Sequence, residues 1–433
     1  MASQHPRPLE GMRIIDLTVV WAGPYATMQL ADWGAEVIRV ESTQHFANST
    51  RGTTPRPPRA MAGATTRGGF GFPNGEPGER PWNRTPVFNA HGRGKRSMTV
   101  DLTRPEGFEV LRRLVSMSDG LVENNLAPNI EKLGVTWDAM SAINSNLIMV
   151  RMPAFGLTGP YRGYRTWGNH MEALTGHTLI RTYGNVSPEY APNGVPSDAA
   201  GGVSAALGFV LGLRQRRKTG KGVLIESATA ENFVSFLGEF VMDYSMNGRT
   251  WEQMGNDHMS WAPHNVYPCA GEERWVTIAV RSDAEWVALC EVMMQPELAS
   301  SARFALEAYR HAHRADLDAI IADWTQSFDP YWLMYRLQER GIPAGVVMSD
   351  SEVLESRHHE ARGFFQEFEH PEAGRYRHTG PLWNASKTEN PVARAAPRLG
   401  EDNEYVYKQL LGFSDAEYTA FEEAGHIGMD YPL

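Results

Sequence analysis

The segment from Pro196 to Gly202 places two side chains with chemical potential directly before a helix. Ser197 and Asp198 are followed by small residues at 199–202, and apolar residues then recur at helical spacing over 203–211. The first turn of a helix has unpaired N–H groups and carries the positive end of the dipole, so a carboxylate there is favoured as an anion. Asp198 is therefore predicted to be ionised at neutral pH and open to close approach by a ligand.

A simpler interpretation of the same segment is capping. Serine and aspartate are favoured N-cap residues and stabilise a helix by about 0.5–2 kcal/mol. On that preference alone, Ser197 or Asp198 would be an N-cap without chemistry. The rest of the chain decides between the two interpretations.

Composition narrows the function classes. A chain of 433 residues exceeds the usual size of one core, which predicts two domains. A net charge of −10 without a dense basic run argues against a nucleic-acid partner, so an anionic ligand needs a local basic cluster. The sequence has no run of 18 apolar residues and no apolar N-terminal stretch, which predicts no membrane segment and a cytoplasmic location.

Metal, disulfide and hydrolase chemistry find little support. Cys269 and Cys290 are the only cysteines, too few for a disulfide scaffold or a cysteine zinc site, and the histidines are scattered. No GxSxG nucleophile elbow is present, and neither cysteine has an obvious histidine partner in the sequence. We therefore expect no metal.

Strands and helices alternate along the first part of the chain. A strand over 12–20, a helix over 25–33 and a strand over 36–41 predict a βαβ unit, and further strands are expected over 98–102, 119–124 and 147–152. This pattern predicts a doubly wound α/β domain with a Rossmann-like parallel sheet. The first turn lacks GxGxxG, so the topology brings no NAD site with it.

The sequence pattern in the second half of the chain predicts a second domain. Residues 250–345 have the pattern of a smaller α+β domain, and residues 1–230 with 346–433 form the large domain. Residues 231–249 are expected to connect the two domains as a helix, since a long helical pattern runs over 229–244.

Three loops are candidate ligand-binding segments. The first is the basic turn at 89–97, where Lys95 and Arg96 could hold a phosphate or belong to a solvated basic loop. The second is the Gly/Pro/Arg-rich stretch 43–92, which is either a cover or subunit contact or a solvated loop. The third is the loop 255–264.

Motifs along nearly the whole chain, in one order, resemble the class III CoA-transferase family, which includes formyl-CoA transferase, carnitine CoA-transferase and the alpha-methylacyl-CoA racemases. The motifs are LEGMRIIDL at 9–17, AGP at 22–24, GAEVIRVE at 34–41, KRS at 95–97, VEN at 122–124, RKTGKG at 217–222, GIPAG at 341–345 and APRLG at 396–400.

This resemblance implies an activity and an assembly. It implies a CoA-binding Rossmann-like domain, a smaller domain, and two ring-like subunits interlocked as a homodimer. It places the family's catalytic aspartate on Asp198, which attacks an acyl-CoA thioester to give a mixed anhydride and then an aspartyl-CoA thioester that a carboxylic acid acceptor displaces. Nearby N–H groups would stabilise the oxyanion. The implied CoA contacts are Ala22, Gly23, Lys95, Arg96, Val100, Lys132 and Arg165.

Four positions depart from the family pattern. Trp21 and Val19 stand where formyl-CoA transferases would have glutamine and histidine, which predicts a more apolar pocket and, with other aromatic residues, hints at a bulky or aromatic acid. Ser42 replaces an expected arginine at the nucleotide. Gly168 stands where racemases have a catalytic aspartate, and glycine offers neither acid nor base.

Two alternatives stay open. One is an acyl-CoA racemase or lyase on the same scaffold, with His170 or Glu172 in place of the missing aspartate at 168. The other is that the chain is a subunit of a heteromeric transferase and supplies structure and CoA binding to a related subunit. The loop 255–264 occupies the place of the family's mobile glycine-rich loop without being a glycine run.

Overall fold

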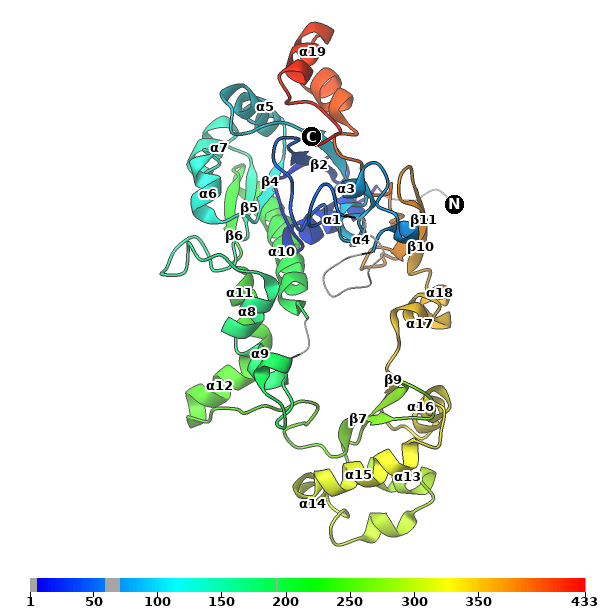
Figure 1. The fold of residues 1–433 in the computed structure, drawn as a ribbon. Helices are drawn as coiled ribbons and strands as arrows, with labels where there is room; N and C mark the ends of the chain where they lie inside the picture. Colours follow the sequence, from blue (N-terminus) through cyan, green and yellow to red (C-terminus); the bar gives the residue numbers. More distant parts are fainter. Residues whose placement is uncertain (1–5, 59–70, 192–193, 433) are drawn as a thin grey trace. The chain divides into compact units, whose positions relative to one another are not determined.

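The computed structural model describes residues 6–58, 71–191 and 194–432. The chain divides into two compact units. The first consists of residues 1–175, 194–238 and 358–433, and the second consists of residues 176–193 and 239–357. The first unit contains the parallel sheet and the segment around Asp198 (Figure 1).

Six parallel strands form the sheet of the first unit, in the order β3-β2-β1-β4-β5-β6. They are β1 (Arg13–Asp16), β2 (Glu36–Glu41), β3 (Arg96–Thr99), β4 (Gly120–Glu123), β5 (Ile148–Arg151) and β6 (Val223–Glu226). This is the doubly wound order, and the predicted α/β fold with a Rossmann-like sheet is confirmed. The strand order reverses between β1 and β4, the point where such sheets bind ligands at their carboxyl edge.

Helices cover both faces of this sheet. One face packs on α5 (Pro105–Ser116), α7 (Trp137–Ile143) and the C-terminal segments η5 (Tyr405–Leu410) and α19 (Asp415–Glu423). The other face packs on α1 (Ala22–Asp32) and α10 (Pro196–Thr219). Adjacent residues of β1 serve the two faces, since Ile15 belongs to the first core and Ile14 to the second.

Shorter helices complete the first unit. They are α3 (Pro81–Arg84), α4 (Pro86–Gly92), α6 (Ala127–Lys132), α8 (Gly168–Leu174), α11 (Thr229–Val234) and α18 (Arg357–Ala361). A two-stranded antiparallel hairpin, β10 (Phe365–His370) and β11 (Gly374–Thr379), also belongs to it. The single helix expected over 229–244 is wrong: α11 is followed by a 3-10 turn at Ser235–Leu237 and by α12 (Gly238–Asn247).

The second unit is built on a three-stranded antiparallel sheet in the order β7-β8-β9. Its strands are β7 (His264–Pro268), β8 (Trp275–Ala279) and β9 (Ala344–Val346). The helices that pack on it include α13 (Asp283–Val292), α15 (Arg314–Thr325) and α16 (Pro330–Glu339), which bury Trp286 in a separate apolar core. Within the described residues, no helix is long and apolar enough to cross a membrane.

Candidate active site

Asp198 lies in the first turn of α10. The helix begins at Pro196, its N-cap position is Val195, and no side chain caps it. Ser197 is fully buried, and among the described residues its hydroxyl donates to the Gly168 carbonyl at 3.5 Å rather than capping α10. The capping interpretation is therefore wrong for both residues. The Asp198 side chain is half-buried and so open to a ligand.

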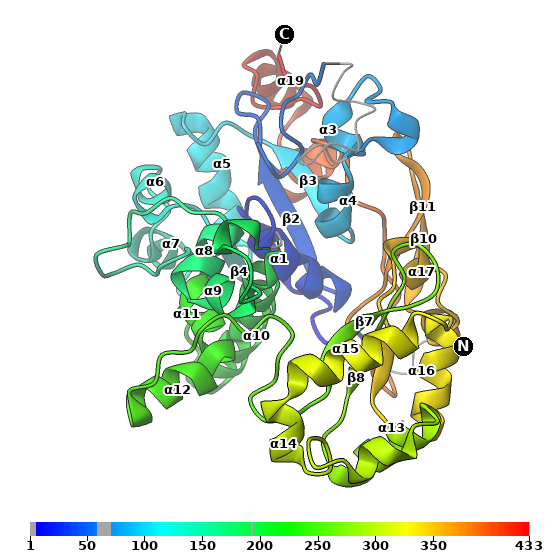
Figure 2. The ribbon, with the colours of Figure 1, turned by 60° about the horizontal axis from the view of Figure 1, so that its bottom comes forward.

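Helix α8 packs against the start of α10, with α11 beside both (Figures 1 and 2). Glu172 of α8 is fully buried, and its Oε1 accepts the backbone N–H of Ser197 at 2.8 Å. Gly168 begins α8, and a Cβ atom there would lie closer to Asp198 Oδ2 than any normal contact and 2.5 Å from Val195 Cγ1. Only glycine leaves room for the Asp198 carboxylate at this place.

The electrostatics of Asp198 differ from the expectation. Burial raises its pKa, and the Glu172 carboxylate adds to the effect, so that the pKa reaches about 6 against an ordinary 3.8. The helix position alone predicted a favoured anion. Burial and the Glu172 charge outweigh that stabilisation. The Ser197 N–H is held by Glu172, and the Asp198 N–H bonds to the Val195 carbonyl at 3.1 Å. Asp198 is still mostly ionised at pH 7, but it is a more basic carboxylate than the sequence indicated.

The loop after β1 is fixed at the point where the strand order reverses. Asn124, which follows β4, accepts the Val19 N–H at 2.7 Å and donates to the Val19 carbonyl at 2.9 Å. Val20 has a φ of +65°, which is strained for a β-branched residue, and its N–H donates to Thr50 Oγ1 at 2.7 Å. These bonds fix the backbone that leads into α1.

The start of α1 packs against α10 one turn beyond Asp198. A Cβ atom on Gly202 would lie 2.8 Å from both the Ala22 carbonyl and the Tyr25 ring. Asp198 and Gly202 are one turn apart on the same face of α10. The predicted thioester neighbours Ala22 and Gly23 are therefore brought to the face of α10 that carries Asp198. Their N–H groups belong to a first helical turn, where helix geometry leaves them without intrahelical partners.

Aromatic side chains form a wall beside this contact. The Trp21 ring lies 5.0 Å from the Tyr25 ring and 4.6 Å from the His91 ring, centroid to centroid. Burial lowers the pKa of His91 to about 3, so this imidazole is neutral at pH 7. The wall has an apolar character, in line with the departure from the family pattern noted at Trp21.

Lys95 belongs to a buried polar network under α1. Its ammonium donates to Asp16 Oδ2 at 3.0 Å, to the Pro24 carbonyl at 2.8 Å and to Thr27 Oγ1 at 2.7 Å. Burial would raise the pKa of Asp16, but Lys95 and Arg39 outweigh it and hold that pKa at about 2. Burial lowers the pKa of Lys95 to about 8. A phosphate contact from Lys95 stays a prediction, and it requires the ammonium to leave these partners.

The other predicted CoA contacts differ in exposure. Arg96 is partly exposed and pairs with Glu36 at 3.1 Å and with Asp402 at 2.8 Å. Val100 is buried in the core. Lys132, at the end of α6, and Arg165, before α8, are exposed. Exposed cations of this kind are available to an anionic ligand, and all four assignments stay predictions.

The 43–92 stretch is partly described and the 255–264 loop is fully described. In the 43–92 stretch, residues 59–70 lie outside the described residues, and the rest contains α3, α4 and Arg51, which is fully buried and pairs with Glu41 at 2.6 Å. The 255–264 segment belongs to the second unit, where the His258 and Trp261 rings stack 4.1 Å apart. The covering and gating roles of these loops stay predictions. Among the described residues, no cluster of histidine, cysteine or acidic side chains has the arrangement of a metal site.

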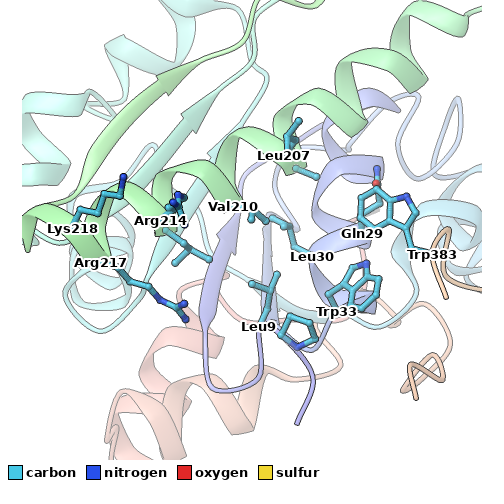
Figure 3. A pocket seen from close by; sticks show the side chains of 13 residues that line it. Leu9, Gln29, Leu30, Trp33, Leu207, Val210, Arg214, Arg217, Lys218 and Trp383 are labelled. Carbon is cyan, nitrogen blue, oxygen red and sulfur yellow. The ribbon is translucent and has the colours of Figure 1, made fainter. Parts of the chain in front are cut away.

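A cavity of about 540 Å³ lies between α1 and α10, on the side away from the first turns (Figure 3). Leu30, Trp33, Leu207 and Val210 line it, together with Trp383. Arg214, Arg217 and Lys218 stand at one end. Asp198 is not among its lining residues, so this cavity is separate from the candidate nucleophile.

Comparison with known proteins identifies the family. CoA-transferase family III matches residues 9–403, and the chain belongs to this family of enzymes. A solved CAIB/BAIF family protein from Brucella suis aligns with a TM-score of 0.79 at 27% identity, over 94% of this chain and 100% of that one. Rv3272 from Mycobacterium tuberculosis shares the fold, with a TM-score of 0.74 at 23% identity over 93% of this chain and 100% of that one.

Named relatives transfer CoA between acids. The succinyl-CoA–D-citramalate CoA-transferase of Chloroflexus aurantiacus is 32% identical over 98% of this chain and 99% of its own length. The beta subunit of a succinyl-CoA–L-malate CoA-transferase from the same organism is 29% identical over 95% of this chain and 96% of its own length. The chain is thus similar both to a transferase whose name mentions no subunit and to a protein named as a subunit of a transferase.

Proposed function

We propose that the protein moves CoA from an acyl-CoA donor to a carboxylic acid acceptor with Asp198 as the nucleophile. The observation that carries this proposal is the half-buried Asp198 carboxylate, seated beside Gly168 at the start of α10 with a pKa of about 6. A carboxylate of this basicity is ionised at neutral pH and more nucleophilic than an ordinary surface aspartate.

The reaction balances with Asp198 as the only covalent group. A carboxylate oxygen attacks the thioester carbonyl carbon and the C–S bond breaks. The products are an aspartyl–acyl anhydride and a CoA thiolate that stays in the site. The thiolate then attacks the aspartyl carbonyl, which releases the donor acid and forms an aspartyl-CoA thioester. The acceptor carboxylate reverses these two steps, so that acceptor-CoA leaves and the Asp198 carboxylate is regenerated. First-turn N–H groups of Ala22 and Gly23 supply oxyanion donors.

Substrate class follows from the relatives and from the aromatic wall. We infer succinyl-CoA as the donor because both Chloroflexus relatives are named for it. The Trp21, Tyr25 and His91 rings, with His91 neutral, suit an acceptor acid with an apolar body. CoA phosphates are expected at the cations Arg96, Lys132 and Arg165, with Lys95 beneath the site, and two copies of the chain are expected to form the working enzyme.

The test is covalent trapping at Asp198. Incubation with succinyl-CoA followed by hydroxylamine should convert the Asp198 carboxyl to a hydroxamate, a mass change confined to one peptide. Asp198→Asn should abolish both the label and turnover, by about 10⁴-fold or more. Asp138→Asn is the matched control, since Asp138 also lies in the first turn of a helix in the same unit but is exposed. Turnover by an unlabelled wild-type enzyme would refute the proposal.

The same sample distinguishes a racemase. Gly168 provides no acid or base beside the substrate α-carbon, so solvent deuterium should not enter that carbon in the absence of an acceptor. Deuterium incorporation that persists in Asp198→Asn would place the chemistry on another residue.

A further inference from the structure

Helix α8 presents two residues, one turn apart, to the start of α10. Gly168 leaves the space that Asp198 Oδ2 fills, and Glu172 accepts the Ser197 N–H at 2.8 Å. A spacing of four residues puts both on one face of α8. Both are buried, Glu172 completely. One helix face therefore provides the seat of the Asp198 carboxylate and a second carboxylate beside it.

The Glu172 contact changes what the start of α10 offers to Asp198. No side chain at Val195 caps the helix, so the Ser197 N–H is a first-turn donor free to attract a nearby anion. Glu172 takes that donor from a different helix. The carboxylate of Asp198 is thereby denied the hydrogen bond and much of the dipole stabilisation that its position would otherwise give.

We propose that Glu172 is a positioning residue for CoA transfer: it occupies the Ser197 N–H and, with Gly168, holds the Asp198 carboxylate where this first-turn donor is already taken. The carboxylate then attacks the thioester as a stronger nucleophile than a capped aspartate would be. This inference rests on the proposed role of Asp198 and adds the residue that sets its reactivity.

The charges around the pair agree with this assignment. Burial and the Glu172 carboxylate are the two causes that raise the pKa of Asp198 to about 6. Within the described part of the first unit, the elements packed against α8 and α10 carry other ionisable side chains, namely His170 on α8, Tyr25 and Asp32 on α1, Arg151 at the end of β5, Glu226 at the end of β6 and Glu231 on α11. His170, Glu226 and Glu231 are exposed, so water screens their effect on Asp198, while Asp32 and Arg151 are paired with Arg93 and Glu123.

Glu172→Gln tests the electrostatic part. Glutamine keeps an oxygen that accepts the Ser197 N–H but removes the charge, so the fold should be retained. The acid limb of the kcat/KM profile should move to lower pH by about 0.5–1 unit, the size of shift that one nearby charge produces. The kcat at pH 8 should fall several-fold while the KM for succinyl-CoA changes less than about threefold. Glu231→Gln removes a charge from the exposed face of α11 and should leave the profile unchanged. A Glu172→Gln profile that coincides with wild type overturns the proposal.

Gly168→Ala tests the seat without touching a charge. The added methyl group must displace the Asp198 carboxylate, and misplacement of a reacting group by about 1 Å costs on the order of 100-fold in rate. We expect kcat to fall by at least about tenfold and the thermal midpoint to decrease, because the methyl group also crowds Val195, with the fold retained at the assay temperature. A folded Gly168→Ala variant with the kcat of the wild type would refute the claim that Gly168 positions the Asp198 carboxylate.

The experiments distinguish a failure of the Asp198 assignment from a failure of the role proposed for Glu172 and Gly168. If Asp198→Asn retains activity, the nucleophile assignment is wrong and Glu172 loses its role with it. If Asp198→Asn is inactive and Asp198 is trapped, but Glu172→Gln and Gly168→Ala both behave as wild type, only the inference on α8 is wrong.

Discussion

The Asp198 carboxylate makes activity depend on pH near neutrality. Only the ionised form attacks a thioester, and burial with the Glu172 charge places the pKa at about 6. We expect kcat/KM to be flat above pH 7 and to fall about tenfold per pH unit below pH 6. A profile measured with succinyl-CoA from pH 4.5 to 8.5 checks this. Full activity down to pH 4.5 would show an aspartate with an ordinary pKa.

The same shift predicts a stability cost. The pKa of Asp198 is about 6 in the folded protein against an ordinary 3.8, so the folded state binds the proton more tightly than the unfolded state. The ionised carboxylate therefore destabilises the fold above pH 6, and the cost disappears as pH falls toward 4. Asp198→Asn should raise the free energy of unfolding by about 1–3 kcal/mol at pH 8 and by little at pH 4. Urea titrations at the two pH values measure it, and a less stable variant at pH 8 contradicts it.

Sequence reasoning located the residue but not its surroundings. Asp198 stands out by type and position, and the family motifs assign it a role. The sequence suggests Glu172 only as a substitute racemase base, because its hydrogen bond to Ser197 joins residues 25 positions apart. At Gly168 the sequence indicates only a missing acid, whereas the structure shows that this glycine leaves space for the Asp198 carboxylate. One signal was present: Gly168 and Glu172 have the spacing of one helix face.

At the scale of the elements, Gly202 allows α10 to pack closely on α1. Gly202 lies against the Ala22 carbonyl and the Tyr25 ring, so any side chain there must push the two helices apart. Gly202→Val should cost about 1–3 kcal/mol of stability, the usual penalty of overpacking, and should raise the KM for acyl-CoA by moving Ala22 and Gly23. Thermal unfolding and steady-state kinetics measure the two effects.

A glycine-to-valine change at Gly238 separates the effect of close packing on stability from the effect of helix propensity. Gly238 lies at the start of α12 and has open space around its Cα. Gly238→Val should therefore change stability by less than about 1 kcal/mol and leave the KM unaltered. Equal effects at Gly202 and Gly238 would remove the argument from close packing.

Elements could be predicted where local pattern decides them. The strands of the sheet are short β-branched runs between turn residues, and the predicted segments over 119–124 and 147–152 contain β4 and β5. Pattern failed over 229–244 because continuous helical propensity there conceals the 3-10 turn at Ser235–Leu237. The strain at Val20 depends on Asn124 and Thr50, which are distant in sequence, and no local signal announces it.

At the scale of the whole molecule, α10 has an outer face that one chain leaves open. Leu207 and Leu211 are each 55% exposed and Val210 is 44% exposed, next to the cavity lined by Trp33 and Trp383. An apolar face of this kind marks an interface in soluble proteins. Family resemblance implies a dimer, and a second copy of this chain is the expected cover.

Charges on this face should therefore separate the subunits. We expect wild-type protein to have the mass of two chains in light scattering and the Leu207→Glu/Leu211→Glu variant to shift toward one, since a buried carboxylate without a partner costs several kcal/mol. Ser116→Glu adds a charge to an exposed position of α5, on the other face of the sheet, and should leave the mass unchanged. A wild-type chain that is monomeric and inactive alone, but active with a related subunit, would place this face in a heteromer, as the name of the malate transferase subunit describes for that protein.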